Sequence, residues 1–123
     1  MKIVVLTCAA CLLGPAAAHA QAAEGTYPGT LSCDARPDAR AVRAPVTVEI
    51  ERGRAHYTVR TDGGVETGGG AMTGRQLALT GRGNGYEVRY AGEVSGTGGI
   101  LTGFRTAKGS RRPCQMLLGS GRS

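Results

Sequence analysis

From Tyr27 onward the chain runs in short stretches of alternating apolar and polar residues, separated by segments rich in glycine. The clearest alternation covers 46–60, where two such stretches flank Arg52-Gly53. A period of two is the repeat of a β-strand with one buried face, and a glycine between two such stretches marks a tight turn. This segment therefore predicts a β-hairpin.

Similar stretches recur as far as Leu118, and no window of helical length carries apolar residues at helical spacing. We therefore expect an all-β fold of about eight antiparallel strands in sequential, hairpin-connected order, with essentially no helix. The strands are expected at about 27–33, 46–51, 55–60, 66–72, 75–80, 86–94, 100–107 and 113–118.

The inward faces of these strands supply a modest apolar core. Its expected members are Leu31, Val46, Val48, Ile50, Tyr57, Val59, Leu77, Leu79, Val88, Tyr90, Val94, Phe104, Met116 and Leu118. Phe104 is included as the bulkiest residue of its stretch. An eight-stranded barrel is just wide enough to be filled by side chains or to hold one small ligand, and we expect a filled interior.

The first twenty residues have the layout of a secretory signal peptide. Lys2 precedes an apolar run over 3–13, and Ala18-His19-Ala20 has the small-x-small pattern of a cleavage site. The run is shorter than the ~20 apolar residues that cross a bilayer, so cleavage is favoured over a retained anchor. We expect residues 1–20 to be removed, leaving 21–123 as a single periplasmic or secreted β domain without stable membrane insertion.

Two cysteines, Cys33 and Cys114, remain after this removal. An even cysteine count in an oxidising compartment favours a disulfide over the alternative of two free thiols. The bridge would join the first predicted strand to the last, because bridged Cα atoms lie only ~4.4–6.8 Å apart. A meander whose end strands meet is a closed barrel or a tight sandwich, and we favour the barrel.

The chain is basic, with a formal net charge of +6. Most arginines, Arg105 among them, are spread along the chain with acids between them, as on a solvated surface. Two loops, 34–43 and 108–112, hold denser positive charge. They give a candidate contact surface made of Arg36, Arg40, Arg43, Lys108, Arg111 and Arg112.

The residues give no catalytic site. His56, the one histidine of 21–123, falls on the outward register of its strand with no nucleophile nearby. Glu49 and Glu51 share a strand face, but they lack an apolar pocket and fit a solvated surface. The sequence therefore predicts a protein without enzymatic activity.

Metal and cofactor sites are not expected either. Asp34 and Asp38 could hold a weak calcium ion, but Arg36 and Arg40 beside them oppose it. The glycine-rich segment 81–85 resembles a phosphate-binding loop, yet a β pattern follows it where that loop needs a helix. A hairpin turn is the better interpretation.

Nucleic-acid binding is not expected. Tyr86 and Tyr90 fall on the inward face of their strand while Arg89 points outward, so the basic and stacking groups do not combine on one surface. Export would also separate the protein from nucleic acid.

An opening strand that ends at Cys33, a meander, and Cys114 before a short final strand resemble the layout of small periplasmic β-barrel proteins. Among these are the membrane-bound or periplasmic inhibitors of C-type lysozyme, which have a bridge between early and late cysteines. The closer likeness is to small secreted bacterial β proteins of unassigned activity. The resemblance implies a small exported barrel and assigns no functional residues.

Two functions remain open. The leading hypothesis is a non-enzymatic binding or inhibitor module of the bacterial envelope, whose basic loops contact an acidic or polymeric envelope component or a protein. The alternative is a lipocalin-like carrier of a small apolar ligand, which requires an open interior of at least ~300 Å³. An enzyme would require His56 to turn inward beside a carboxylate. The sequence makes no prediction of the oligomeric state.

Overall fold

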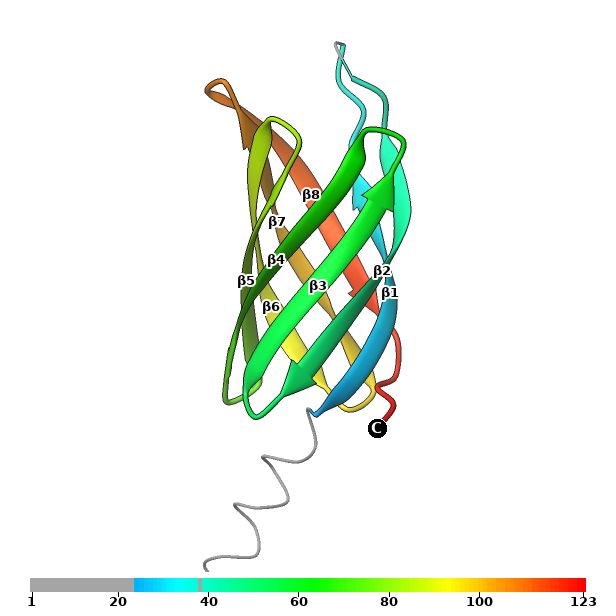
Figure 1. Cartoon of the computed structure of the whole chain (residues 1–123), viewed down its shortest axis with the longest axis vertical. Helices are drawn as coiled ribbons and strands as arrows, with labels where there is room; N and C mark the ends of the chain where they lie inside the picture. The colour runs from blue at the N-terminus through cyan, green and yellow to red at the C-terminus, as the bar shows by residue number, and fades with distance from the viewer. Residues whose placement is uncertain (1–23, 38) are drawn as a thin grey trace, which may run out of the picture.

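The computed structural model describes residues 24–37 and 39–123, which form a closed antiparallel barrel (Figure 1). Each strand pairs with the next along the chain, and the last pairs with the first. The eight strands are β1 (Gly25–Cys33), β2 (Val42–Glu51), β3 (Arg54–Thr61), β4 (Gly64–Thr73), β5 (Gln76–Gly83), β6 (Tyr86–Ser95), β7 (Gly98–Ala107) and β8 (Ser110–Leu118). No helix occurs among these described residues, as expected. The predicted signal segment, 1–20, and Asp38 lie outside them.

The barrel closes along a short seam between β1 and β8. Five residue pairs form this seam, from Gly29 opposite Leu118 to Cys33 opposite Cys114. Cys33 and Cys114 form the predicted disulfide, with Cα atoms 4.1 Å apart. That separation is close to the ~4.5 Å of a narrow, non-hydrogen-bonded pair in an antiparallel sheet. The barrel, rather than the sandwich, is therefore confirmed.

Alternation of burial along the strands follows the predicted faces. In β2 and β3 every second residue is buried, including Val48 and Val59 at 0% exposure. Every expected core residue except Phe104 is buried, and Tyr27, Ala44, Ala55 and Leu101 join the same cluster. The core is thus a single column of side chains inside the barrel.

The placement of Phe104 in the core is wrong. Phe104 is 42% exposed, whereas Leu101 and Arg105, whose side chains lie on the other face of β7, are buried. The register with β8 determines which face of β7 points inward, because Leu101 lies opposite Met116 and is buried with it. Outside the barrel the guanidinium of Arg111 lies over the Phe104 ring, 4.1 Å from its centroid. The expectation of a surface position for Arg105 is wrong for the same reason.

Several strands extend further than the sequence indicates. The predicted loop 108–112 shrinks to the turn Lys108-Gly109, so Arg111 and Arg112 are residues of β8. Lys108 and Gly109 both have positive φ, 50° and 78°, the geometry of a two-residue turn that suits twisted strands. Pairing between β7 and β8 therefore continues up to the turn. Arg43 likewise lies in β2 and not in a loop.

The two ends of the barrel differ. At the end where the C-terminus lies (Figure 1), Thr26 and Arg122 exchange two backbone hydrogen bonds, and Gly121 packs against the Tyr27 ring. The chain after β8 therefore packs against this end. The opposite end carries the long β1–β2 connection and the β7–β8 turn. We call it the basic end, because most of the predicted contact residues lie there.

No helix in the described part of the chain is both long enough and apolar enough to span a membrane.

The first prediction concerns the seam. Replacing both cysteines (Cys33→Ala with Cys114→Ala) frees a loop of 81 residues in the unfolded chain. We expect the free energy of unfolding to fall by roughly 4–5 kcal/mol on the chain-entropy estimate. Denaturant unfolding followed by circular dichroism measures this loss. A double variant as stable as the parent protein would show that the disulfide does not hold the barrel closed.

Candidate functional site

A carboxylate lies inside the barrel, near its basic end. Glu66, on β4, is 1% exposed, and its two oxygens accept four side-chain hydrogen bonds. Tyr57 and Tyr90 donate to Oε2 at 2.8 and 2.7 Å. Tyr86 and Arg105 donate to Oε1 at 2.8 and 2.9 Å. These five residues, here called the Glu66 cluster, join four strands and surround the carboxylate with donors, which offsets the large cost of burying a charge.

Two glycines leave the space that the tyrosine side chains need in order to reach Glu66. A Cβ on Gly81 would overlap the Tyr57 hydroxyl, and a Cβ on Gly83 would overlap the Tyr86 ring. Both glycines belong to the segment 81–85, which forms a hairpin as predicted. These glycines therefore make room for tyrosine side chains inside the barrel, in addition to leading into the hairpin turn.

Burial raises the pKa of the Tyr57, Tyr86 and Tyr90 hydroxyls well above their ordinary value near 10. Desolvation is the largest cause for each, and the negative charge and hydrogen bond of Glu66 raise the pKa further. The three phenols therefore stay protonated and keep donating to the carboxylate at any ordinary pH.

Arg105 connects this cluster to the end of the barrel. Its Nη2 pairs with Glu66, and its guanidinium lies over the Tyr86 ring, 4.3 Å from the centroid. The Arg105 side chain is only 9% exposed. Ion pair and cation–π contact together fix a buried guanidinium just inside the basic end.

The predicted contact residues converge at this end from two distant parts of the chain. One group lies in or just after the β1–β2 connection, and the other lies in the β7–β8 turn and the start of β8. The two groups are Arg36, Arg40 and Arg43, and Lys108, Arg111 and Arg112.

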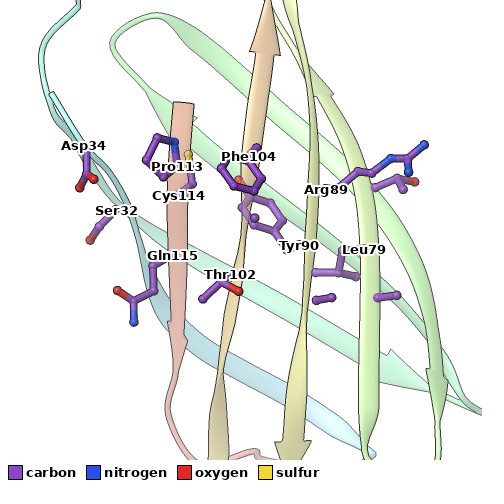
Figure 2. A pocket seen from close by; sticks show the side chains of 14 residues that line it. Ser32, Asp34, Leu79, Arg89, Tyr90, Thr102, Phe104, Pro113, Cys114 and Gln115 are labelled. Atoms are coloured by element: carbon purple, nitrogen blue, oxygen red, sulfur yellow. The ribbon is translucent and has the colours of Figure 1, made fainter. Parts of the chain in front are cut away.

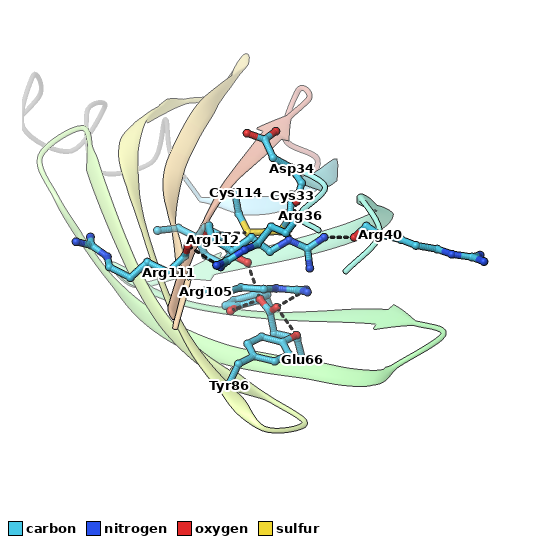
Figure 3. The surroundings of a disulfide bond; sticks show 12 residues. Cys33, Asp34, Arg36, Arg40, Glu66, Tyr86, Arg105, Arg111, Arg112 and Cys114 are labelled. Carbon is cyan, nitrogen blue, oxygen red and sulfur yellow. Dashed lines mark hydrogen bonds and ion pairs between the residues drawn. A yellow bond between two sulfur atoms is a disulfide. The ribbon is translucent and has the colours of Figure 1, made fainter. Parts of the chain in front are cut away.

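Hydrogen bonds to backbone carbonyls hold these two groups together (Figure 3). Arg36 Nη1 donates to the carbonyl of Arg111 at 2.7 Å. Arg112 Nε donates to the carbonyl of Asp34 at 2.7 Å, and its Nη2 donates to that of Arg40. These arginine side chains thus link the β1–β2 connection to β8 through hydrogen bonds, beside the disulfide.

A pocket of about 410 Å³ opens between these segments. Its lining includes four cationic residues, Arg36, Arg105, Lys108 and Arg112, together with Tyr86 and Ser110. No acid is among the described residues that line it. Figure 3 shows Arg36 and Arg112 beside the disulfide, close to Arg105, Glu66 and Tyr86. The pocket is therefore a positively charged recess that ends at the Glu66 cluster.

A second hollow, of about 670 Å³, lies on the outer wall of the barrel (Figure 2). Small outward side chains such as Ala78, Ala91 and Thr102 form part of it, and Phe104 and Arg89 border it. It mixes apolar and polar groups and gathers no set of titratable side chains. We find no chemistry that it would perform.

The remaining candidates do not form a site. His56 is outward as predicted, its side chain 69% exposed, with Nε2 3.4 Å from Glu49 Oε1 on the neighbouring strand. Asp34 is exposed. Within the described residues, no three histidine, cysteine, aspartate or glutamate side chains are grouped as metal ligands.

Sequence reasoning missed Glu66 and Arg105. A usable signal was present in the expected inward positions Tyr57, Tyr86 and Tyr90, because buried phenols require hydrogen-bond acceptors. Glu66 is the acidic residue on the inward parity of β4.

The second prediction tests the pairing of Glu66. Glu66→Gln removes the charge that balances buried Arg105, so we expect a loss of roughly 3–5 kcal/mol in unfolding free energy. The matched control is Glu87→Gln, since Glu87 pairs with Arg82 on the exposed surface, 3.8 Å away. That change should cost at most about 1 kcal/mol. Equal losses in the two variants, measured by chemical denaturation, would contradict the proposed role of the cluster.

The third prediction follows from the raised tyrosine pKa values. Above pH 10 the unfolded chain loses phenolic protons that the folded protein retains, so stability is complete below pH 10 and falls as pH rises. Three such groups give a slope of roughly 4 kcal/mol per pH unit. Phenolate absorbance should therefore appear together with loss of the β-sheet circular dichroism signal. Titration of all the tyrosines near pH 10 in a folded protein would contradict this.

Comparison with known proteins adds no assignment to this geometry: no protein-family model, no curated protein and no solved structure matches the chain.

Proposed function

We propose that this protein is an exported, non-enzymatic binding module of the bacterial envelope that uses the basic end of its barrel to bind an acidic partner. The observation that carries the proposal is the convergence of two basic segments, around Arg36 and around Arg111, on one end of a closed barrel. A surface of one charge sign attracts partners of the opposite sign and speeds their association.

The scaffold supports this role. A closed barrel has no unpaired strand edge, and the chain after β8 is hydrogen-bonded to its opposite end. The basic end is the part of the molecule where the long β1–β2 connection and the β7–β8 turn border a recess. The disulfide and the predicted signal peptide both suit a protein that acts outside the cytoplasm.

The packed interior counts against the lipocalin-like carrier. Tyr57 and Tyr90 meet edge to face inside the barrel, with ring centroids 5.8 Å apart, and both contact Glu66. Arg105 reaches the same carboxylate from β7. A carrier of an apolar ligand would instead need an open, apolar interior at this level.

The fourth prediction tests the basic end by removing positive charge either from it or from another part of the surface. Arg40→Ser with Arg111→Ser removes two exposed cations from the basic end, while Arg54→Ser with Arg75→Ser removes two exposed cations elsewhere. We expect the first pair to weaken binding to immobilised polyglutamate and to envelope extract roughly tenfold at low salt. The second pair should change binding much less.

High salt should abolish the difference between the two double variants, because exposed charges are screened over about 10 Å at 0.1 M salt. Binding that is insensitive to salt, or weakened equally by both pairs, would contradict a specific role for the basic end.

A further inference from the structure

We propose that the recess at the basic end is a binding site for a phosphate monoester group, with Arg105, Ser110 and Lys108 as its donors. This inference deepens the proposed function, on which it rests for the location of the partner, by naming the group that enters the pocket.

Two buried donors in the pocket lining lack acceptors. Arg105 Nε and Ser110 Oγ are both shielded from solvent, and no described residue accepts a hydrogen bond from either. Unsatisfied buried donors are rare in folded proteins, because each has lost its hydrogen bonds to water without gaining a partner. The Ser110 hydroxyl turns about a single torsion angle, which allows it to face an oxygen placed in the pocket. The lining is therefore suited to an acceptor that the chain itself does not provide.

The inner face at this end also sets two positive charges opposite each other. Arg105 and Arg112 are register partners on β7 and β8, and both occupy inward positions. Like charges directly opposite on a sheet are destabilising, and Glu66 balances one of them inside the barrel. Lys108 adds another cation in the adjoining turn. An anion bound between these side chains would lower this repulsion.

The placement of the donors on separate side chains favours a tetrahedral group over a carboxylate. A planar carboxylate is best matched by the two parallel N–H groups of one guanidinium. Here Arg105 Nη2 is used by Glu66, while Arg112 Nε and Nη2 are used by backbone carbonyls. The proposed donors are Arg105 Nε, Ser110 Oγ and the point charge of Lys108, which lie on three separate residues. A phosphate monoester offers three oxygens in different directions and a charge of about −1.5 to −2.

Three variants separate this site from general attraction. Ser110→Ala removes one donor, and Lys108→Asn removes one charge with a residue that tolerates the positive φ of this turn. The control is Arg75→Gln, which removes an exposed charge that lies outside both the pocket lining and the predicted contact surface. None of the three touches the Glu66–Arg105 pair.

The probes are inorganic phosphate and acetate at equal ionic strength, measured by calorimetry, and phosphatidylcholine vesicles with or without phosphatidic acid, measured by sedimentation. We expect phosphate to bind more tightly than acetate. Ser110→Ala and Lys108→Asn should each weaken phosphate binding about tenfold. Arg75→Gln should weaken it less than about threefold.

The two probes also identify the source of the group. Binding of free phosphate alone points to a soluble phosphorylated ligand, and additional, variant-sensitive binding to phosphatidic acid vesicles points to a lipid headgroup. Absence of phosphate-selective binding in both assays overturns the inference, as does a loss in Arg75→Gln equal to that of the pocket variants. In those cases salt-sensitive binding to polyglutamate would leave the proposed function standing, and loss of that binding too would remove both.

Discussion

The pairing of β1 with β8 is the constraint on which the other features depend. It turns a meander of hairpins into a closed barrel, and the bond between Cys33 and Cys114 makes that closure covalent. Closure also sets the β1–β2 connection beside the start of β8, although Arg36 and Arg111 are 75 residues apart. An open meander would hold the same arginines on opposite edges of a sheet. The basic end is therefore a product of topology, and not of any local cluster in the sequence.

The Glu66 cluster shows a second level of organisation inside this frame. A buried carboxylate with a guanidinium is seldom the most stable way to fill a core, because apolar residues of similar volume often do as well or better. Here the ion pair holds Arg105 just beneath the recess and orders three tyrosines around it. The polar interior and the charged surface are thus continuous, with Arg105 shared between them. This continuity gives a physical reason for keeping charge in a small barrel.

Much of the fold could be predicted because strands with one buried face have a period of two. Val48 and Tyr57 lie in stretches where apolar and polar residues alternate without interruption, which leaves one possible parity. Prediction failed in β7, where Gly98, Gly99 and Gly103 leave few side chains to define parity, and the bulk of Phe104 was misleading. The register with β8 decides that parity, and register is a property of the closed sheet.

The candidate site was predicted only in part. The basic loops were recognisable from composition, but their meeting at one end required the seam between β1 and β8. Glu66 and Arg105 were missed because each is a charged residue, and single charged residues are rarely buried unless paired. Their partners come from other strands, so the pairing that permits burial has no local signature.

Contacts across the seam are the most direct test of this account. In a narrow antiparallel pair the Hα atoms of opposite residues face each other, and Leu31 lies opposite Met116, two residues from the disulfide pair. We expect a strong nuclear Overhauser effect between the Hα atoms of Leu31 and Met116, with slow amide exchange in β1 and β8. Absence of that contact, with rapid exchange in both strands, would show that the sheet is open and that the basic end does not assemble as described.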